Sequence, residues 1–122
     1  MSLYLSVLDN VNKFNIDSKI LFYNNLSVFF RSIKEFDLYK EINEFLIKLI
    51  GTNNISNQIK ACVYWNKAYI CLQENNLDDT FKYLDLCIKN DKVTNLKDIM
   101  ESDDFNSIKK DKRFIEIINR YK

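Results

Sequence analysis

Apolar residues recur along most of this chain at intervals of three and four, which is the period of one face of an α-helix. The segments that carry the pattern are approximately 3–14, 18–34, 38–50, 56–74, 78–90 and a last one from about Asp111. A short helical turn is also expected at 96–100. In the fifth segment, the predicted buried face consists of Phe81, Leu84, Cys87 and Ile88.

The second and third segments are rich in apolar positions. These positions are Leu21, Leu26, Phe29, Phe30 and Ile33 in the second segment, and Leu38, Ile42, Phe45, Leu46, Leu49 and Ile50 in the third. Asp17 or Ser18 is placed to cap the start of the second helix. Gly51 is expected to stop the third, as glycine does just past a helix C-terminus.

The chain has one glycine and no proline. Many-stranded sheets need turn residues at short intervals, whereas helices joined by Asn, Asp and Ser turns do not. The predicted fold class is therefore all-α, with about six helices plus the short helical turn. A chain of 122 residues has the length of a single domain, 1–122.

The stretch "ENNLDD", residues 74–79, gathers three acids and two amides between two helical segments. It lacks the alternate ligands, central glycine and distal glutamate of a calcium-binding loop. The pattern instead indicates a turn in which Asn75 and Asn76 tolerate a left-handed backbone. Asp78 and Asp79 would then begin the next helix, where carboxylates meet free N–H groups.

Composition argues against several classes of function. Eighteen basic and seventeen acidic residues give a net charge of +1, so no overall field attracts nucleic acid or an anionic membrane. The first residues lack the pattern of a secretory signal, and no apolar run reaches the roughly eighteen residues of a membrane span. We therefore expect a cytoplasmic protein with no nucleic-acid partner and no membrane association.

Candidate catalytic and metal-binding chemistry is sparse. The chain has no histidine, so the commonest general base and the usual zinc partner of cysteine are absent. Cys62, Cys71 and Cys87 are not spaced as metal-binding pairs, and we expect them to be reduced packing residues. The sequence predicts no catalytic residues, no metal and no cofactor, and hence no enzyme.

A charged segment lies near the C-terminus, where Glu101, Asp103 and Asp104 precede Lys109, Lys110, Lys112 and Arg113. A phosphate-binding patch is one interpretation. The favoured one is a solvated cap whose charges pair locally.

The two halves of the chain repeat one order of residue types. A shift of 41 residues superposes Tyr23 on Tyr64 and Asn25 on Asn66, and it also places Ser27 on Ala68. Aromatic, amide, small residue and turn therefore recur in the same sequence, which suggests two copies of one helix-turn-helix unit.

At these residues the chain resembles a tetratricopeptide repeat, a helix-turn-helix unit of about 34 residues. Residues 61–94 cover one such unit. The positions that match are the aromatic Tyr64, the amide Asn66 and the small residues Ala68, Thr80 and Cys87. The upstream unit matches less well, because Tyr39 and Leu46 replace small residues.

The segment "DDFNSIKKDKRFIEII" resembles the closing segment that often follows such repeats in bacterial proteins. The resemblance covers about 100 residues. It implies a right-handed stack of antiparallel helical hairpins, with units at about 18–50 and 56–91 and a C-terminal cap at 92–122.

In the resembled family, the first helices of successive units line a groove that binds peptides or partner proteins. Carried over to this chain, the groove positions are Leu21, Asn24, Val28, Arg31, Cys62, Trp65, Tyr69, Leu72 and Gln73. Trp65 is the most informative, because Trp, Tyr and Arg dominate binding energy at protein interfaces. A second interpretation stays open, in which Trp65 and Tyr69 only pack against the N-terminal helix or the C-terminal tail.

Three hypotheses of function follow. The first is a small adaptor that binds a protein or peptide partner in this groove, with a homodimer also possible. The alternative is a bacterial immunity protein that neutralises a cognate toxin, which a small, near-neutral helical chain would suit. A catalytic or nucleic-acid role is disfavoured by the missing histidine and the balanced charge.

Overall fold

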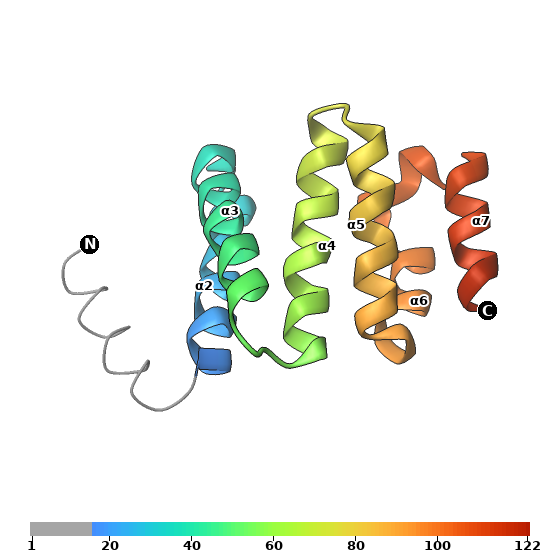
Figure 1. Cartoon of the computed structure of the whole chain (residues 1–122). Helices are drawn as coiled ribbons and strands as arrows, with labels where there is room; N and C mark the ends of the chain where they lie inside the picture. The colour runs from blue at the N-terminus through green and yellow to red at the C-terminus, as the bar shows by residue number, and fades with distance from the viewer. Residues whose placement is uncertain (1–15) are drawn as a thin grey trace. The chain divides into compact units, whose positions relative to one another are not determined.

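The computed structural model describes residues 16–122 (Figure 1). All regular structure in this range is helical, and no strand occurs in it, so the all-α prediction is confirmed for these residues. The helix predicted at 3–14 lies outside the described residues. The chain divides into two compact units, Met1–Ile59 and Lys60–Lys122.

The described part of the first unit is a helical hairpin. Helix α2, Ile16–Ser32, packs against helix α3, Phe36–Thr52. The two are joined by a tight turn in which Lys34 adopts a left-handed backbone with φ of 66°. The N–H of Glu35 donates to the carbonyl of Phe30 at 2.8 Å, which closes the end of α2.

Both predicted signals at the helix ends of this hairpin are wrong. Asp17 and Ser18 already lie inside α2 rather than capping it, and the Asp17 carboxylate accepts the backbone N–H of Ser56 at 3.2 Å. Gly51 lies within α3, which continues to Thr52. The side-chain amide of Asn53 donates to the carbonyl of Leu49 at 2.9 Å, so this end needs no left-handed glycine.

The buried face of α2 also differs from the predicted apolar positions. The buried residues of α2 are Ile20, Asn24 and Ser27, and those of α3 are Tyr39, Asn43, Leu46 and Ile50. Several residues that the pattern marks as apolar positions are exposed instead, namely Leu21, Phe29, Ile33, Leu38 and Phe45. Two of three buried positions on α2 are polar, so hydrophobicity alone did not reveal the packing face.

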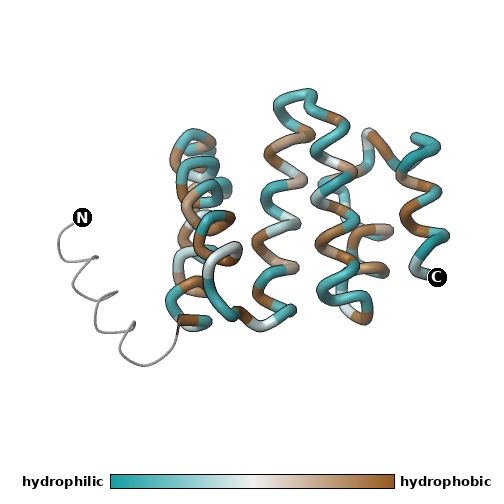
Figure 2. The backbone as a smooth tube through the Cα atoms, in the orientation of Figure 1, coloured by the Kyte–Doolittle hydropathy of each residue, from teal (hydrophilic) through white to brown (hydrophobic). Residues whose placement is uncertain are grey.

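The second unit contains most of α4 and four further helical segments. Helix α4, Asn57–Gln73, begins in the last residues of the first unit, and the rest of it belongs to the second. The elements that follow are α5 Leu77–Asn90, α6 Lys92–Glu101, the 3-10 helix η1 Asp103–Ile108 and α7 Lys112–Tyr121. Hydrophobic and hydrophilic stretches alternate along these helices (Figure 2). The short helical turn predicted at 96–100 is part of a longer helix, α6.

One continuous hydrophobic core holds the second unit together. Its buried members are Ala61, Ala68, Phe81, Leu84, Cys87, Ile88, Ile99, Phe105, Ile108, Phe114, Ile117 and Ile118. The four residues predicted as the buried face of the fifth helix are all among them, so that prediction is confirmed. Every helical segment after α4 contributes to this core, and burial of its apolar area is the main term that stabilises the unit.

The stretch "ENNLDD" is the turn between α4 and α5, as predicted. Asn75 has a left-handed φ of 60°, whereas Asn76 does not and is instead the N-cap of α5. The Asn76 side chain accepts the N–H of Asp79 at 3.2 Å and donates to the Asp79 carboxylate at 2.9 Å. Asp78 and Asp79 both lie in the first turn of α5, where the helix dipole favours negative charge.

Polar contacts attach α7 to α5. Arg113 pairs with Asp78 at 3.0 Å near the start of α7. At its end, the Asp85 carboxylate accepts hydrogen bonds from Arg120 at 2.7 Å and from the Tyr121 hydroxyl at 2.8 Å. One arginine near each end of α7 is therefore paired with an acid of α5.

Candidate protein-binding surfaces

The groove positions predicted on α2 differ in their exposure. Asn24 is buried and Arg31 is half-buried, whereas Val28 exposes 43% of its surface and Leu21 exposes 42%. Asn24, Val28 and Arg31 follow one another at spacings of four and three, so they lie along one side of the helix. Of these three, Val28 presents the most apolar surface to solvent.

Trp65 contacts the C-terminal part of the second unit. Its indole N–H donates to Oδ2 of Asp104 at 3.0 Å, and its ring lies 5.3 Å from that of Phe105, centroid to centroid. Tyr69 and Leu72 are half-buried and pack against the same core, whereas Gln73 is exposed at the end of α4. Packing of Trp65 against the tail was one of the two alternatives that the sequence left open.

The three cysteines form no disulfide. Cys71 and Cys87 are buried, as expected, but Cys62 is exposed and is not a core residue. Neighbouring atoms desolvate the Cys62 sulfur, which together with the nearby charge of Asp91 raises the pKa of this thiol. Burial raises the pKa of Cys87 further, with smaller effects from Cys62 and Asp91. Both thiols therefore stay protonated at neutral pH, where only a thiolate would be an effective nucleophile.

The solvent-facing side of α2 is unusual because it carries no charge. The exposed residues of α2 are Ser18, Leu21, Asn25, Val28, Phe29 and Ser32. Phe29 exposes 54% of its surface, and Ile33, which follows directly after the helix, exposes 50%. A hollow of about 410 Å³ lies beside them, lined by Phe22, Asn25, Leu26 and Phe29. We refer to Leu21, Val28, Phe29 and Ile33 as the α2 face.

Phe29 and Ile33 are not among the binding residues that the sequence predicts. The sequence does contain a feature that points to this helix: only three of the 17 residues of α2 are charged, namely Asp17, Lys19 and Arg31. A helix with so few charges is normally enclosed by other elements. The exposed positions of α3, by contrast, include Asp37, Glu41, Glu44 and Lys48.

No protein-family model matches this chain, and no significant match was found among curated proteins or solved structures. Within residues 16–122, no group of three or more His, Cys, Asp or Glu side chains is arranged to hold a metal ion. None of the helices in that range combines the length and apolar character required to cross a membrane.

Proposed function

We propose that this chain is a non-catalytic protein-interaction module that binds a protein or peptide partner through the α2 face. The observation that carries the proposal is the absence of charge at every exposed position of α2, together with the exposure of Leu21, Val28 and Phe29. Contiguous apolar surface of this kind marks interaction sites in soluble proteins.

Burial of the α2 face against a partner would supply a substantial driving force. Covering one large apolar side chain contributes about 1.5–3 kcal/mol relative to leaving it exposed. Val28 and Phe29 are half-exposed, so each would gain part of that amount. Arg31, half-buried beside them, can add a charge-assisted hydrogen bond at the rim of the contact. A helix that presents apolar residues at such spacings suits a hydrophobic groove on the partner.

The resemblance to tetratricopeptide repeats forms part of the proposal. It is supported by the burial of Asn66, Ala68, Thr80 and Cys87, the amide and small residues that match the repeat pattern. All-helical structure in residues 16–122 is compatible with a helical-repeat protein. In this interpretation α2 is the first helix of its repeat, the type of helix that contacts ligands in the resembled family.

Within this proposal the α4 residues take different roles. Trp65, Tyr69 and Leu72 pack against the core of the second unit. The indole N–H of Trp65 also already donates a hydrogen bond to Asp104. Binding energy is therefore expected to come mainly from Val28 and Phe29, with Arg31 as a polar contact on the same unit.

The test compares single acidic substitutions on the two helices of one hairpin. A tagged full-length chain is used to isolate a partner from the native host, and the partner is then purified and titrated against Val28→Glu, Phe29→Glu and Leu38→Glu. Leu38 is also an exposed apolar residue, at 38%, but it lies on α3. We expect Val28→Glu and Phe29→Glu to weaken binding at least about tenfold, the equivalent of 1.4 kcal/mol, and Leu38→Glu to leave it unchanged.

Two outcomes would contradict the proposal. A partner that binds all three variants with wild-type affinity would show that the α2 face is not used. A wild-type homodimer in light scattering that Phe29→Glu converts to monomer would assign the surface to a second copy of the chain. Circular dichroism and urea unfolding of each variant separate loss of binding from loss of fold.

A further inference from the structure

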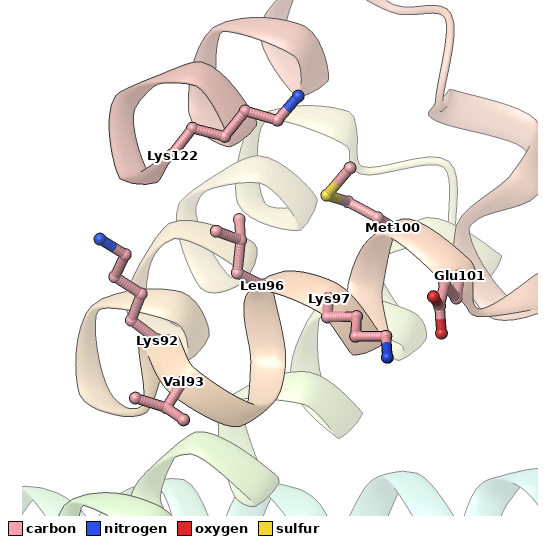
Figure 3. A pocket seen from close by; sticks show the side chains of 7 residues that line it. All are labelled: Lys92, Val93, Leu96, Lys97, Met100, Glu101 and Lys122. Carbon is pink, nitrogen blue, oxygen red and sulfur yellow. The ribbon is translucent and has the colours of Figure 1, made fainter.

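A groove runs along α6 and meets the C-terminal end of α7 (Figure 3). Its volume is about 470 Å³, and its lining residues are Lys92, Val93, Leu96, Lys97, Met100, Glu101 and Lys122. All of them belong to the second unit, whereas the α2 face belongs to the first.

The apolar part of the groove is a row along one side of α6. Val93, Leu96 and Met100 follow at spacings of three and four, the period of one helix face. Val93 exposes 93% of its surface and Met100 exposes 39%, so neither is covered by the core. Figure 3 shows Leu96 and Met100 directed toward the end of α7, with Lys122 opposite them.

A second hollow of about 210 Å³ continues the groove toward α7. Its lining residues are Met100, Lys109, Phe114, Ile115, Ile118, Asn119 and Lys122. Met100 and Lys122 line both hollows, which makes them one surface. Ile115, 47% exposed, extends the apolar row.

The charged side chains that line this surface are almost all lysines. Lys92, Lys97, Lys109 and Lys122 line the two hollows against a single acid, Glu101. Among the described residues, none of these four lysines forms an ion pair. The arginines of α7 differ, because Arg113 and Arg120 are paired with Asp78 and Asp85. The lysine charges are thus available to an external anion, although the chain as a whole is nearly neutral.

We propose that this groove binds an acidic amphipathic helix of a partner protein. The apolar side chains of such a helix would cover Val93, Leu96 and Met100, while its carboxylates would approach Lys92, Lys97 and Lys122. Complementary charge of this kind raises the association rate and selects the partner. The ten residues of α6 span about 15 Å, enough to contact two to three turns of a helix. The recess favours an inserted side chain over a flat lipid surface.

The test titrates the full-length chain with a designed acidic helical peptide that carries Leu at spacings of three and four and Glu at the flanking positions. A twin peptide with Gln in place of every Glu keeps the apolar row and removes the charge. We expect amide chemical shifts in NMR to move at Val93, Leu96, Met100 and Lys122. The acidic peptide should bind at least about tenfold more tightly than its twin, and less tightly as salt screens the charges.

Matched variants locate the effect. Lys92→Glu and Lys97→Glu should each weaken the acidic peptide several-fold, and Val93→Ser should weaken both peptides. Lys82→Glu makes the same charge change at an exposed position of α5 and should leave binding unchanged. Unfolding midpoints close to wild type confirm that the variants fold.

Several results would overturn this inference. Equal affinity for the two peptides, an equal loss in Lys82→Glu, or shifts that map away from α6 and α7 would each remove the acidic-helix site. Failure of the acidic peptide to bind at all would do the same. Binding to vesicles containing phosphatidylserine, without binding to the peptide, would assign the lysines to a membrane surface. None of these outcomes bears on the α2 face, which lies on another unit.

Discussion

The indole N–H of Trp65 donates to Oδ2 of Asp104 at 3.0 Å, joining two residues that lie 39 positions apart in the chain. The Trp65 ring also packs on Phe105, which is fully buried. These two contacts attach η1 to α4. A large aromatic residue that the sequence suggests for recognition thus stabilises the second unit.

Trp65→Ala is expected to destabilise the chain by about 2–4 kcal/mol, because it removes a large half-buried ring and leaves Asp104 without this donor. Trp65→Phe keeps an aromatic ring against Phe105 and should cost less, about 1 kcal/mol for the lost hydrogen bond plus imperfect packing. Urea unfolding followed by circular dichroism measures both values. A change below about 0.5 kcal/mol for Trp65→Ala, typical of a surface substitution, would refute the packing role.

Asn76→Ala should lower the free energy of unfolding by about 1 kcal/mol, because the Asn76 side chain caps α5. Asn75→Gly is the matched control in the same turn. Its left-handed backbone suits glycine, so that variant should be close to wild type. Thermal unfolding with and without added Ca²⁺ extends the test. Stabilisation by Ca²⁺ would contradict the assignment of this acidic stretch to a structural turn.

The cysteines are expected to react with a thiol reagent in a fixed order. Cys62 is exposed and should react first, although its raised pKa makes it slower than a free thiol at pH 7.5. Cys71 and Cys87 are buried and should react only on unfolding. Time-resolved labelling, with peptide mapping by mass spectrometry, identifies the site. Rapid labelling of Cys87 in the folded chain would show that the core around α5 opens.

Stability should fall as the pH rises above about 8.5, the ordinary thiol pKa. The folded state raises the pKa of buried Cys87, so it keeps a proton that the unfolded state loses. The resulting loss approaches about 1.4 kcal/mol per pH unit for this one group. Urea unfolding between pH 7.5 and about 9.5 measures the slope, and Cys87→Ala should have a shallower one. Equal slopes in the two proteins would exclude Cys87 as the cause.

Asp85→Asn should loosen the end of α7, because Asp85 accepts hydrogen bonds from both Arg120 and Tyr121. We expect a loss of stability of about 1 kcal/mol. The pKa of Tyr121 is raised above its ordinary value, mainly by burial and then by the hydrogen bond to Asp85 and the charge of that carboxylate. The nearby Arg120 acts in the opposite direction and lowers this pKa. Removing the carboxylate charge should therefore lower the pKa of Tyr121, measured by NMR titration of ring-labelled tyrosine.

Asp98→Asn provides the control for this substitution, because Asp98 is an exposed acid on α6. It should change stability by less than about 0.5 kcal/mol. A comparable loss in both variants would mean that the effect reflects overall charge and not the attachment of α7.

Local chemistry explains which features the sequence predicted well. The paired amides in "ENNLDD" suit a left-handed turn and an N-cap wherever they lie, so this turn could be recognised without tertiary contacts. The buried face of α5 was equally clear, because Phe81, Leu84 and Cys87 recur at the three-residue spacing of one helix face. In α2 apolar residues occur on several sides of the helix, so the pattern did not identify the packing face.

The sequence by itself determined the helical class of residues 16–122 and the principal turns, because periodicity, capping and backbone preference act over a few residues. Only the tertiary structure decided which apolar residues face solvent. When α2 packs against α3, Phe29 stays exposed, whereas Trp65 donates a hydrogen bond to Asp104 of η1. One aromatic residue therefore faces solvent and the other helps to hold the second unit together. The exposure of a side chain depends on residues that are distant in the chain. Helical spacing shows which residues share a face of the helix, but it does not show which other elements pack against that face.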